Sequence, residues 1–197
     1  AAGRGSSDAA ALLAKYVFEI RLGLPTLSVA PSVHSIYGAK LQLEKALVLA
    51  VSQSGRSPDL VEFCRAATGT DVLRVAMVND VTSPLTAAVD VTLPLMAGPE
   101  TSVAATKSCI AAMTLVLGLV GHWRPESGMK AAFGRASAIL ERAIAADWSG
   151  ADGFLDGDGP VYVVGRGPGL AIAAEVALKL KETSGLHAES ISAAEIR

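Results

Sequence analysis

Short apolar runs alternate along this chain with longer amphipathic stretches that are rich in alanine. The apolar runs cover residues 26–30, 46–51, 73–78 and 91–95. Runs of this length predict buried strands, and a regular alternation of strands and helices is typical of βα units joined into one parallel sheet. The pattern therefore predicts an α/β fold in which helices cover a central parallel sheet.

The periodicity between and after these runs predicts helices over residues 8–22, 58–67, 83–88, 103–122 and 129–146. Start signals mark the first three helices. Ser7 or Asp8 is placed to cap the first one, and Pro58 and Pro84 each follow a serine and stand in a first turn. Pro125 is expected to end the long helix that begins near residue 103.

The opening of the chain recurs about 162 positions later. Gly3-Arg4-Gly5 superposes on Gly165-Arg166-Gly167, and a glycine follows each of the two Ala-rich helical stretches, at Gly23 and Gly185. Both copies predict a strand, a glycine turn, a helix and a glycine stop, so we interpret them as two related α/β units. Chance glycine matches in a chain rich in alanine and glycine are the alternative.

These two units set the expected domain organisation. We expect a first domain over residues 1–125, a linker helix and loop over 126–158, and the N-terminal part of a second domain over 159–197. The linker rests on residues 147–160, which are rich in Gly and Asp. We expect the chain to be part of a longer protein, because a sheet that stops after one βα unit leaves strand edges exposed and because the chain does not begin with Met.

Composition and charge narrow the function classes. The chain is 51% hydrophobic and 5% aromatic, and acids and bases are mixed along it with a net charge of −2, so we expect no nucleic-acid partner. The most apolar segment, residues 108–123, is shorter than the ~20 residues of a membrane span and is expected to be a core helix. Cys64 and Cys109 lack Cys or His at ligand spacing, so we expect buried thiols in a reducing compartment and neither a metal site nor a disulfide.

Two hydroxyl-rich turns follow predicted strands of the first unit. Gly5-Ser6-Ser7 comes after the opening strand, and Ser52-Gln53-Ser54-Gly55-Arg56-Ser57 comes after residues 46–51. Ligands of open parallel sheets bind beyond the carboxyl ends of the strands, where serine hydroxyls, free N–H groups and the positive end of the next helix suit a phosphate. Ordinary capping and turn chemistry is the alternative. Arg56 either assists the phosphate or faces solvent, and we favour solvent.

Residues 100–107 form a third candidate segment, which leads from the fourth predicted strand into the long helix. Their hydroxyls and N–H groups either line the same crevice or cap the helix through Thr101 or Ser102. Both interpretations stay open at the level of sequence.

The second unit carries a stripe of charged residues. Glu175, Lys179 and Glu182 are spaced i, i+4, i+7, which places them on one side of the predicted helix. The stripe is either a solvated face with a Glu–Lys pair, or it faces the crevice, where a carboxylate moves a proton between adjacent carbons of an open-chain sugar. His187, just past the helix, is a minor catalytic candidate.

Several motifs, in order along the chain, resemble a known family. They are Ser52-Gln53-Ser54-Gly55, the run from Ala97-Gly98-Pro99-Glu100 to Thr106-Lys107, and Glu175-Val176-Ala177-Leu178-Lys179-Leu180-Lys181-Glu182 followed by His187-Ala188-Glu189. In these motifs the chain is similar to the tandem sugar isomerase (SIS) domain family. It resembles the isomerase half of glucosamine-6-phosphate synthase, and still more its stand-alone relatives, which include a second class of glucosamine-6-phosphate deaminases.

The resemblance implies a three-layer αβα fold with a five-stranded parallel sheet of the flavodoxin-like kind, in a cytoplasmic protein that forms homodimers. It implies a small-molecule sugar phosphate as ligand and no cofactor. Glu182 would be the base of the aldose–ketose step, with Lys179 positioning it or the substrate. The residues that would hold the sugar phosphate are Ser6, Ser7, Ser52, Gln53, Ser54, Ser57 and, through its backbone, Val103.

The chain departs from the family pattern at three points. Ala105 stands where the synthase commonly has a serine, which removes one hydroxyl from the sugar site. A glutaminase domain with an N-terminal cysteine nucleophile is not among these residues, so the sequence gives no support for ammonia transfer from glutamine. The family motif continues past residues 193–197 into a His-Gly-Pro segment whose histidine is thought to open the sugar ring, and the sequence ends just before it.

Two functions from different classes follow. The first is an enzyme that moves a proton between C1 and C2 of a phosphorylated hexose, coupled to release or addition of ammonia. The second is a non-catalytic module that senses a sugar phosphate, as SIS domains do in some transcription regulators. An enzyme needs Glu182 to point into the crevice, whereas a sensor needs only the serine loops. A purely structural fragment is the third alternative.

Overall fold

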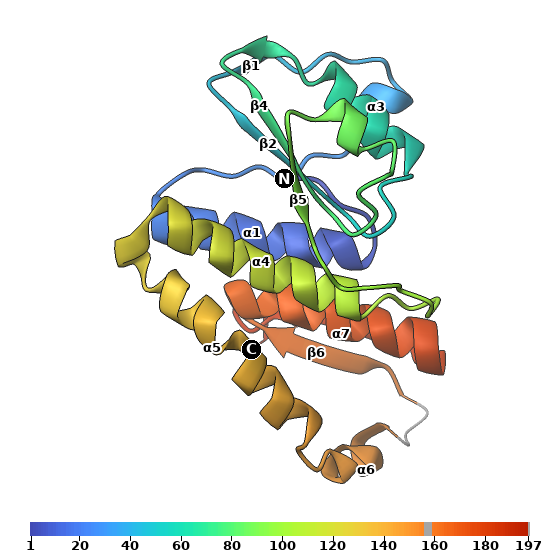
Figure 1. The fold of residues 1–197 in the computed structure, drawn as a ribbon. Helices are drawn as coiled ribbons and strands as arrows, with labels where there is room; N and C mark the ends of the chain where they lie inside the picture. Colours follow the sequence, from blue (N-terminus) through green and yellow to red (C-terminus); the bar gives the residue numbers. More distant parts are fainter. Residues whose placement is uncertain (156–158, 197) are drawn as a thin grey trace.

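The computed structural model describes residues 1–155 and 159–196, and Figure 1 shows its ribbon. The sheet of the first unit contains β2 (Leu47–Ser52), β4 (Leu73–Val78) and β5 (Val91–Pro94). Its main helices are α1 (Ser6–Leu22), α3 (Pro58–Ala66) and α4 (Lys107–Trp123). Shorter elements are α2 (Ser32–Ser35), β1 (Leu43–Glu44), β3 (Gly69–Thr70) and the 3-10 turn Thr86–Ala88. Because the strands form from the predicted apolar runs and alternate with helices, the α/β class is confirmed.

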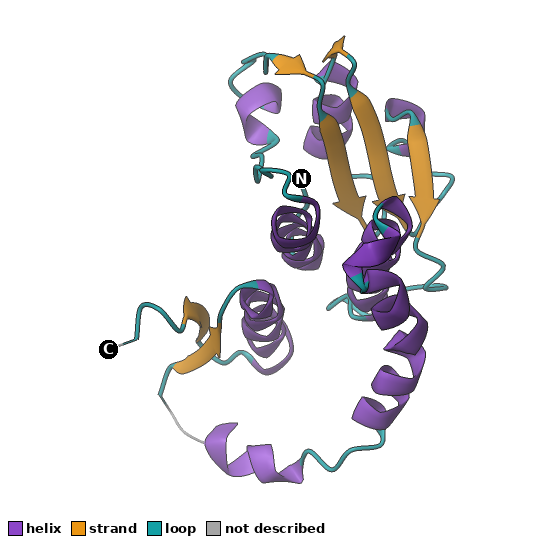
Figure 2. Cartoon of the chain, turned by 90° about the vertical axis from the view of Figure 1, so that its left-hand side faces the viewer, coloured by secondary structure: helices purple, strands orange, loops and turns teal. Residues whose placement is uncertain are grey.

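The sheet has the strand order of a doubly wound fold. β2, β4 and β5 are adjacent and parallel, and Figure 2 shows them side by side. The start of the chain lies on the other side of β2, where Ala2 pairs with Ala50, and Ala1 in turn is hydrogen-bonded to residues 27 and 29. Numbered along the chain, these segments follow the order 2-1-3-4-5, which is the flavodoxin-like arrangement.

Residues 26–30 are bonded to this sheet but do not form the regular strand that the sequence predicts. Ala1 donates to the Leu27 carbonyl oxygen at 2.6 Å and accepts from the Val29 amide at 3.0 Å. A ladder of two bonds to one residue is too short to hold the whole segment in strand geometry. In the described part of the chain, the expected five strands are therefore three regular strands and two short hydrogen-bonded segments.

Successive residues of each strand point to opposite faces of the sheet, and each face is covered by helices. On one face, α1 and α4 cover a buried set from β2 and β4, namely Leu49, Val51, Val75 and Met77. On the other face, α3 covers the alternate set, namely Val48, Ala50, Ala76 and Val78. The three-layer αβα architecture follows from this alternation of small and branched apolar residues.

Two predicted helix starts need correction in the first part of the chain. Helix α1 begins at Ser6 with Gly5 at the N-cap, so neither Ser7 nor Asp8 caps it. The helix expected over residues 83–88 is reduced to the 3-10 turn Thr86–Ala88. Six residues that include a proline are too few for an α-helix, because the loss of conformational entropy in forming the first turn exceeds the stabilisation from the few hydrogen bonds that such a short segment makes.

The long helix begins later than predicted, at Lys107 rather than near residue 103. Glu100 reaches its first turn from outside, because its Oε2 accepts hydrogen bonds from the Ser108 amide at 2.8 Å and the Ser108 hydroxyl at 2.9 Å. This cap leaves the residues between Glu100 and Lys107 as a loop, and the predicted capping by Thr101 or Ser102 is wrong.

The second unit consists of β6 (Val161–Gly165), α7 (Pro168–Ser184) and β7 (Ala188–Ser192), with β6 and β7 parallel. Helix α7 packs against α1, and the two lie side by side in Figure 1. Between the units, α5 (Met129–Ile144) packs on α4 and is followed by the 3-10 turn Ser149–Ala151 and α6 (Asp152–Leu155). The predicted boundary at 147–160 includes residues 156–158, which lie outside the described residues, and the domain limits stay a prediction.

The two units share their local geometry, which confirms the predicted second copy. Gly5 has φ 56° and ψ −130°, and Gly167 has φ 56° and ψ −133°. The helices that follow have 17 residues each, and both end at a left-handed glycine, Gly23 or Gly185. The repeat at 162 positions is therefore a repeat of structure.

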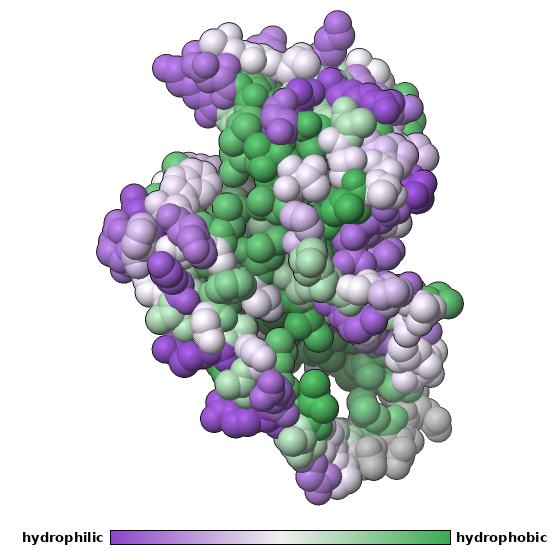
Figure 3. All heavy atoms as spheres, in the orientation of Figure 1, coloured by the Kyte–Doolittle hydropathy of each residue, from purple (hydrophilic) through white to green (hydrophobic). Residues whose placement is uncertain are grey.

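Apolar side chains are exposed on the second unit, among them Tyr162, Val164 and Ile172. Figure 3 shows apolar surface on the same part of the molecule.

Among the helices of residues 1–155 and 159–196, none combines the length and apolar character that crossing a membrane requires.

Candidate functional site

A polar cavity of about 190 Å³ opens where the first strand segment and β2 end, with the turns that follow them on its wall. This is the switch point of the 2-1-3-4-5 sheet. The connections from the first and third segments run to opposite sides of the sheet here, which leaves a crevice in which open α/β sheets bind ligands. The lining residues are Arg4, Ser6, Ser7, Val51, Ser52, Gln53, Ser54, Ser57, Leu60, Val103, Ala105, Ser108, Cys109 and Glu182. All the residues predicted to hold a sugar phosphate, and the predicted base, are among them.

The loop after β2 is organised by its own serines. The Ser52 hydroxyl is buried and accepts a hydrogen bond from the Gly55 amide at 2.9 Å, and the Ser54 hydroxyl accepts one from the Arg56 amide at 3.3 Å. Gly55 has φ 62°, and a Cβ at this position would lie 2.0 Å from the Ser83 hydroxyl oxygen. The loop therefore needs glycine here, and it holds its serines at the mouth of the sheet.

Two helices present their N-terminal ends to the cavity. Ser57 is the N-cap of α3 but makes no side-chain capping bond, so its hydroxyl is available to a ligand. Ser6 and Ser7 open α1 at the same edge, and the amides of Ser7 and Asp8 donate to the carbonyl oxygens of Arg4 and Gly5 within the turn. The serine hydroxyls and the positive ends of two helix dipoles give the cavity an electrostatic preference for anions.

The loop between β5 and α4 closes one side of the cavity. Val103 is fully exposed at its tip, and Ala105 accepts a hydrogen bond from the Ser6 hydroxyl at 3.4 Å. Burial acts to raise the pKa of Glu100, but the hydrogen bonds from Ser108 outweigh it and the pKa is lowered, so the carboxylate stays charged as the cap of α4. The loop is thus anchored at both ends while Val103 projects beside the cavity.

The charged stripe of α7 is a connected set, and one end of it reaches the cavity. The Lys179 Nζ lies 2.5 Å from Glu182 Oε2 and 3.5 Å from Glu175 Oε1. Burial acts to lower the pKa of Lys179, but the hydrogen bond to Glu182 and the charge of Glu175 outweigh it, and the pKa is raised. Glu182 lines the cavity. Lys179 is not among the lining residues and contacts Glu182 from the side away from the cavity.

The remaining candidates lie elsewhere. Arg56 forms an ion pair with Asp80 at 2.8 Å on the exposed side of its loop, as favoured from the sequence. His187 is exposed and is not among the residues that line the cavity. Cys64 and Cys109 are buried, and burial raises the pKa of Cys64 to about 11 and that of Cys109 to about 12, so both are protonated thiols at neutral pH.

The sequence interpretation missed five of the lining residues, namely Arg4, Val51, Leu60, Ser108 and Cys109. Arg4 carried a signal, since it sits in the glycine turn directly after the first strand segment. Ser108 and Cys109 carried none, because only the folding of α4 across α1 brings them to the site. Within residues 1–155 and 159–196, no group of three or more His, Cys, Asp or Glu is arranged to hold a metal ion.

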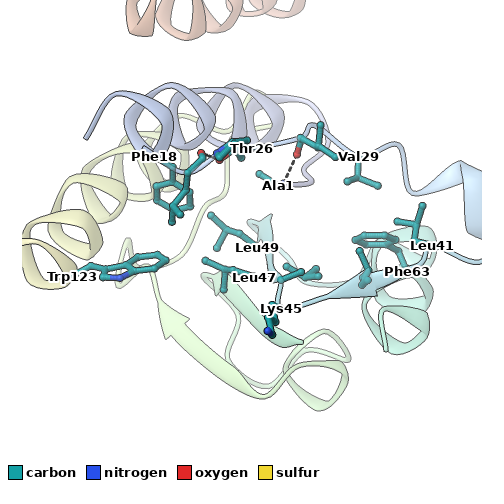
Figure 4. A pocket seen from close by; sticks show the side chains of 16 residues that line it. Ala1, Phe18, Thr26, Val29, Leu41, Lys45, Leu47, Leu49, Phe63 and Trp123 are labelled. Carbon is teal, nitrogen blue, oxygen red and sulfur yellow. Dashed lines mark hydrogen bonds between the residues drawn. The ribbon is translucent and has the colours of Figure 1, made fainter. Parts of the chain in front are cut away.

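A second cavity of about 280 Å³ lies at the opposite, amino-terminal end of the strands. Figure 4 shows it between Phe18 and Trp123 on one side and Leu41 and Phe63 on the other, with Leu47 below Ala1. Its lining is almost wholly apolar and brings no set of polar groups together, so it does not suit a phosphate.

Comparison with known families resolves which kind of α/β protein this is. The model of the SIS domain family matches residues 1–120. The chain belongs to the SIS domain family. The match ends before the second unit, so the stripe on α7 is argued from its own geometry.

Relatives of the SIS chain extend the likeness over its whole length. It is 37% identical over 205 residues to the glutamine–fructose-6-phosphate aminotransferase (isomerizing) of Aeropyrum pernix, covering 98% of this chain and 33% of that protein. A solved structure from Silicibacter pomeroyi DSS-3, provisionally assigned as a phosphosugar isomerase, has a TM-score of 0.93 and 44% identity and covers 99% of this chain and 60% of its own.

A third relative is the C-terminal domain of glucosamine-fructose-6-phosphate aminotransferase from Francisella tularensis. Its structure has a TM-score of 0.78 and 25% identity, and the match covers 99% of the SIS chain and 58% of that chain. The SIS chain thus spans 33% of the curated relative and 60% of the solved structure described above. The resemblance to the SIS family and to the isomerase half of the synthase, inferred from the motifs, is confirmed.

Proposed function

We propose that the SIS chain forms the sugar-phosphate site of an aldose–ketose isomerase that acts on an amino-sugar or hexose 6-phosphate, as a glucosamine-6-phosphate deaminase or a synthase-type isomerase does. One observation supports this most strongly. Serines from two loops of the first unit and Glu182 from the second unit line a single cavity. A phosphate anchor and a carboxylate on opposite sides of one cavity are what proton transfer on a phosphorylated sugar requires.

In the proposed site, the serine loops bind the phosphate and leave the other end of the sugar toward α7. Hydroxyls of Ser52, Ser54 and Ser57 donate to the phosphate oxygens, and the positive ends of the α3 and α1 dipoles stabilise the bound charge. This arrangement uses neutral donors and helix dipoles, which bind a phosphate without a metal. Val103, on the exposed loop, adds a backbone contact to the sugar.

Glu182 is the proposed base. Its carboxylate removes the proton from C2 of the open-chain aldose, the C2–H electron pair forms the C1–C2 double bond, and the C1=O π pair moves to O1, which takes a proton from water to give the enediol. The same carboxyl group then returns its proton to C1 while O2 loses its proton to water and becomes the ketone oxygen. Lys179, at 2.5 Å from Glu182, orients the carboxylate through a charge-assisted hydrogen bond. In an amino sugar, the resulting C2 imine releases ammonia on addition of water.

The decisive experiment measures products and binding together. The chain, and the longest natural form that contains it, are incubated with glucosamine 6-phosphate, and ammonia and fructose 6-phosphate are assayed. Fructose 6-phosphate in D₂O is a second substrate, because solvent deuterium enters C1 if Glu182 shuttles the proton. Failure of every hexose phosphate to react, with binding intact, would contradict the enzymatic proposal.

A Ser54→Ala variant tests the phosphate anchor separately. Loss of a hydroxyl that faces the cavity is expected to weaken fructose 6-phosphate binding about fivefold, which corresponds to roughly 1 kcal/mol. Binding of neutral fructose provides the control, since it lacks the group that Ser54 contacts. Equal weakening for both ligands would show that the loop had been disturbed instead.

A sensor function is favoured by one observation. The Glu182 carboxylate is already engaged by Lys179 in a short ion pair, as in a purely structural stripe. If the module only senses sugar phosphates, Glu182→Gln leaves binding unchanged and no substrate turns over in the unaltered protein. This outcome separates the two functions without knowledge of the sugar.

A further inference from the structure

The phosphate site described so far uses uncharged donors, yet one basic side chain also lines the cavity. Among the described lining residues, Arg4 is the only one with a basic side chain. It lies in the glycine turn between the first strand segment and α1, next to Ser6 and Ser7. Its side chain is 52% exposed, so a ligand can reach it without displacing the core.

The turn fixes where Arg4 stands. Gly5 has the positive φ of 56°, and a Cβ on Gly3 would lie 2.4 Å from the Ser7 carbonyl oxygen, so both neighbours of Arg4 need to be glycine. The Arg4 carbonyl oxygen accepts a hydrogen bond from the Ser7 amide at 3.1 Å. The backbone of Arg4 is therefore held at the edge of the site, and its side chain extends from there.

Asp59 holds the guanidinium group. Nε of Arg4 donates to Asp59 Oδ2 at 2.9 Å, and Nη2 donates to the same oxygen. A guanidinium has five N–H donors, so three remain after these two bonds. The pair fixes the orientation of the fork and leaves its other edge for a second acceptor.

The position of Asp59 explains why a cation is needed there. Asp59 lies in the first turn of α3, two residues after Ser57, and its carboxylate is 25% exposed. An unpaired carboxylate at that place would repel an anion bound at the N-terminal end of the same helix. Arg4 cancels this charge and adds donors whose planar geometry matches two phosphate oxygens.

We propose that Arg4 binds the phosphoryl group of the substrate, with Asp59 as its positioning partner, and that this pair makes the site select dianionic sugar phosphates over neutral sugars. The inference rests on the proposed function and extends it, since it adds a positively charged donor, Arg4, to a phosphate site whose other proposed donors are neutral. Arg4 does not take part in proton transfer.

Titration calorimetry with fructose 6-phosphate and with inorganic phosphate tests the assignment. Arg4→Gln is expected to weaken the binding of both ligands about tenfold. This is less than a buried charged hydrogen bond would contribute, because solvent screens the half-exposed Arg4 side chain. Arg4→Lys keeps the charge but not the fork and is expected to lose about threefold. Raising the salt concentration should weaken binding less in Arg4→Gln than in the unaltered chain.

Asp59→Asn separates a ligand role from a structural one. If Arg4 binds the phosphate, Asp59→Asn removes the group that orients the guanidinium but also a negative charge close to the anion, so it is expected to weaken binding less than Arg4→Gln does. If the ion pair merely holds the loop, Arg4→Gln and Asp59→Asn weaken binding alike, which overturns the proposal. Arg166→Gln is the matched control, because Arg166 occupies the same glycine turn in the second unit and does not line the cavity.

The proposal and the function it rests on can fail separately. If the unaltered chain binds neither ligand, the proposed function fails and Arg4 has no phosphate to bind. If the unaltered chain binds fructose 6-phosphate and Arg4→Gln binds it equally well, only the assignment of Arg4 is overturned.

Discussion

The two copies of the opening unit differ in what they do with one and the same scaffold. Helices α1 and α7 each have 17 residues, begin after matching glycine turns and end at left-handed glycines. Hydrogen bonds also correspond, since the Leu24 amide donates to the Phe18 carbonyl oxygen and the Leu186 amide to that of Leu180. The backbone is repeated almost bond for bond, so differences in function must come from side chains.

Three positions on the helix carry the difference. Where α7 has Glu175, Lys179 and Glu182, α1 has Leu13, Val17 and Ile20 at the positions 162 residues earlier. Leu13 and Val17 are buried in the core between α1 and the sheet. The first copy thus uses this stripe for packing, while the second uses it for charge.

The glycine turns differ in the opposite direction, because here the first copy carries the polar side chains and the second copy does not. After its glycine turn the first copy has Ser6 and Ser7, which line the polar cavity, whereas the second has Pro168 and Gly169. Proline supplies no N–H group and glycine no hydroxyl, so the second turn is poorly suited to hold a phosphate. This difference agrees with the proposed function, in which the first copy binds the phosphate and the second copy supplies the base.

The largest expected effect comes from making the second helix chemically inert, as the first is. Glu182→Gln is expected to lower turnover by about a thousandfold while the affinity for fructose 6-phosphate changes little, because an amide cannot accept the proton. Steady-state kinetics and calorimetry measure the two quantities. Normal turnover in this variant would show that another group is the base.

A matched pair of glycine substitutions tests whether the two turns are structurally equivalent. A Cβ on Gly3 would lie 2.4 Å from the Ser7 carbonyl oxygen, and one on Gly165 would lie 2.4 Å from that of Gly169. Gly3→Ala and Gly165→Ala are each expected to lower the free energy of unfolding by about 3 kcal/mol, measured by denaturant titration. Only Gly3→Ala should weaken phosphate binding beyond what its stability loss explains.

The smallest effect concerns the ionisation of the charged stripe. The folded pKa of Lys179 is raised, so its contribution to stability is complete below the unfolded value of about 10.4 and is lost as the pH rises through the folded value. The difference in unfolding free energy between the unaltered chain and Lys179→Met should be constant from neutral pH to about pH 10 and shrink above it.

The sequence alone was enough for the elements whose pattern is local. The apolar runs at 46–51 and 73–78 and the glycine turns gave strands and helices close to those observed. The start of α4 was misplaced because its cap, Glu100, comes from eight residues before Ser108, outside any local capping pattern. The 26–30 strand was overestimated because strand formation depends on a neighbour that only the tertiary fold supplies.

For the candidate site, motif order pointed to the serine loops and Glu182, but not to everything around them. Arg4 was visible in the glycine turn, yet its role depends on Asp59, which lies 55 residues away and meets it only in the folded chain. Lys179 was placed with the catalytic set by its spacing from Glu182, and the structure puts it behind that residue rather than on the cavity wall.

In the proposed function, the serine loops and Glu182 belong to different repeats, so the packing of α7 on α1 sets the distance between the bound phosphate and the base. A shift of one helix along the other would then abolish proton transfer and leave phosphate binding intact. A descendant that lost Glu182 would still bind the same sugar phosphates.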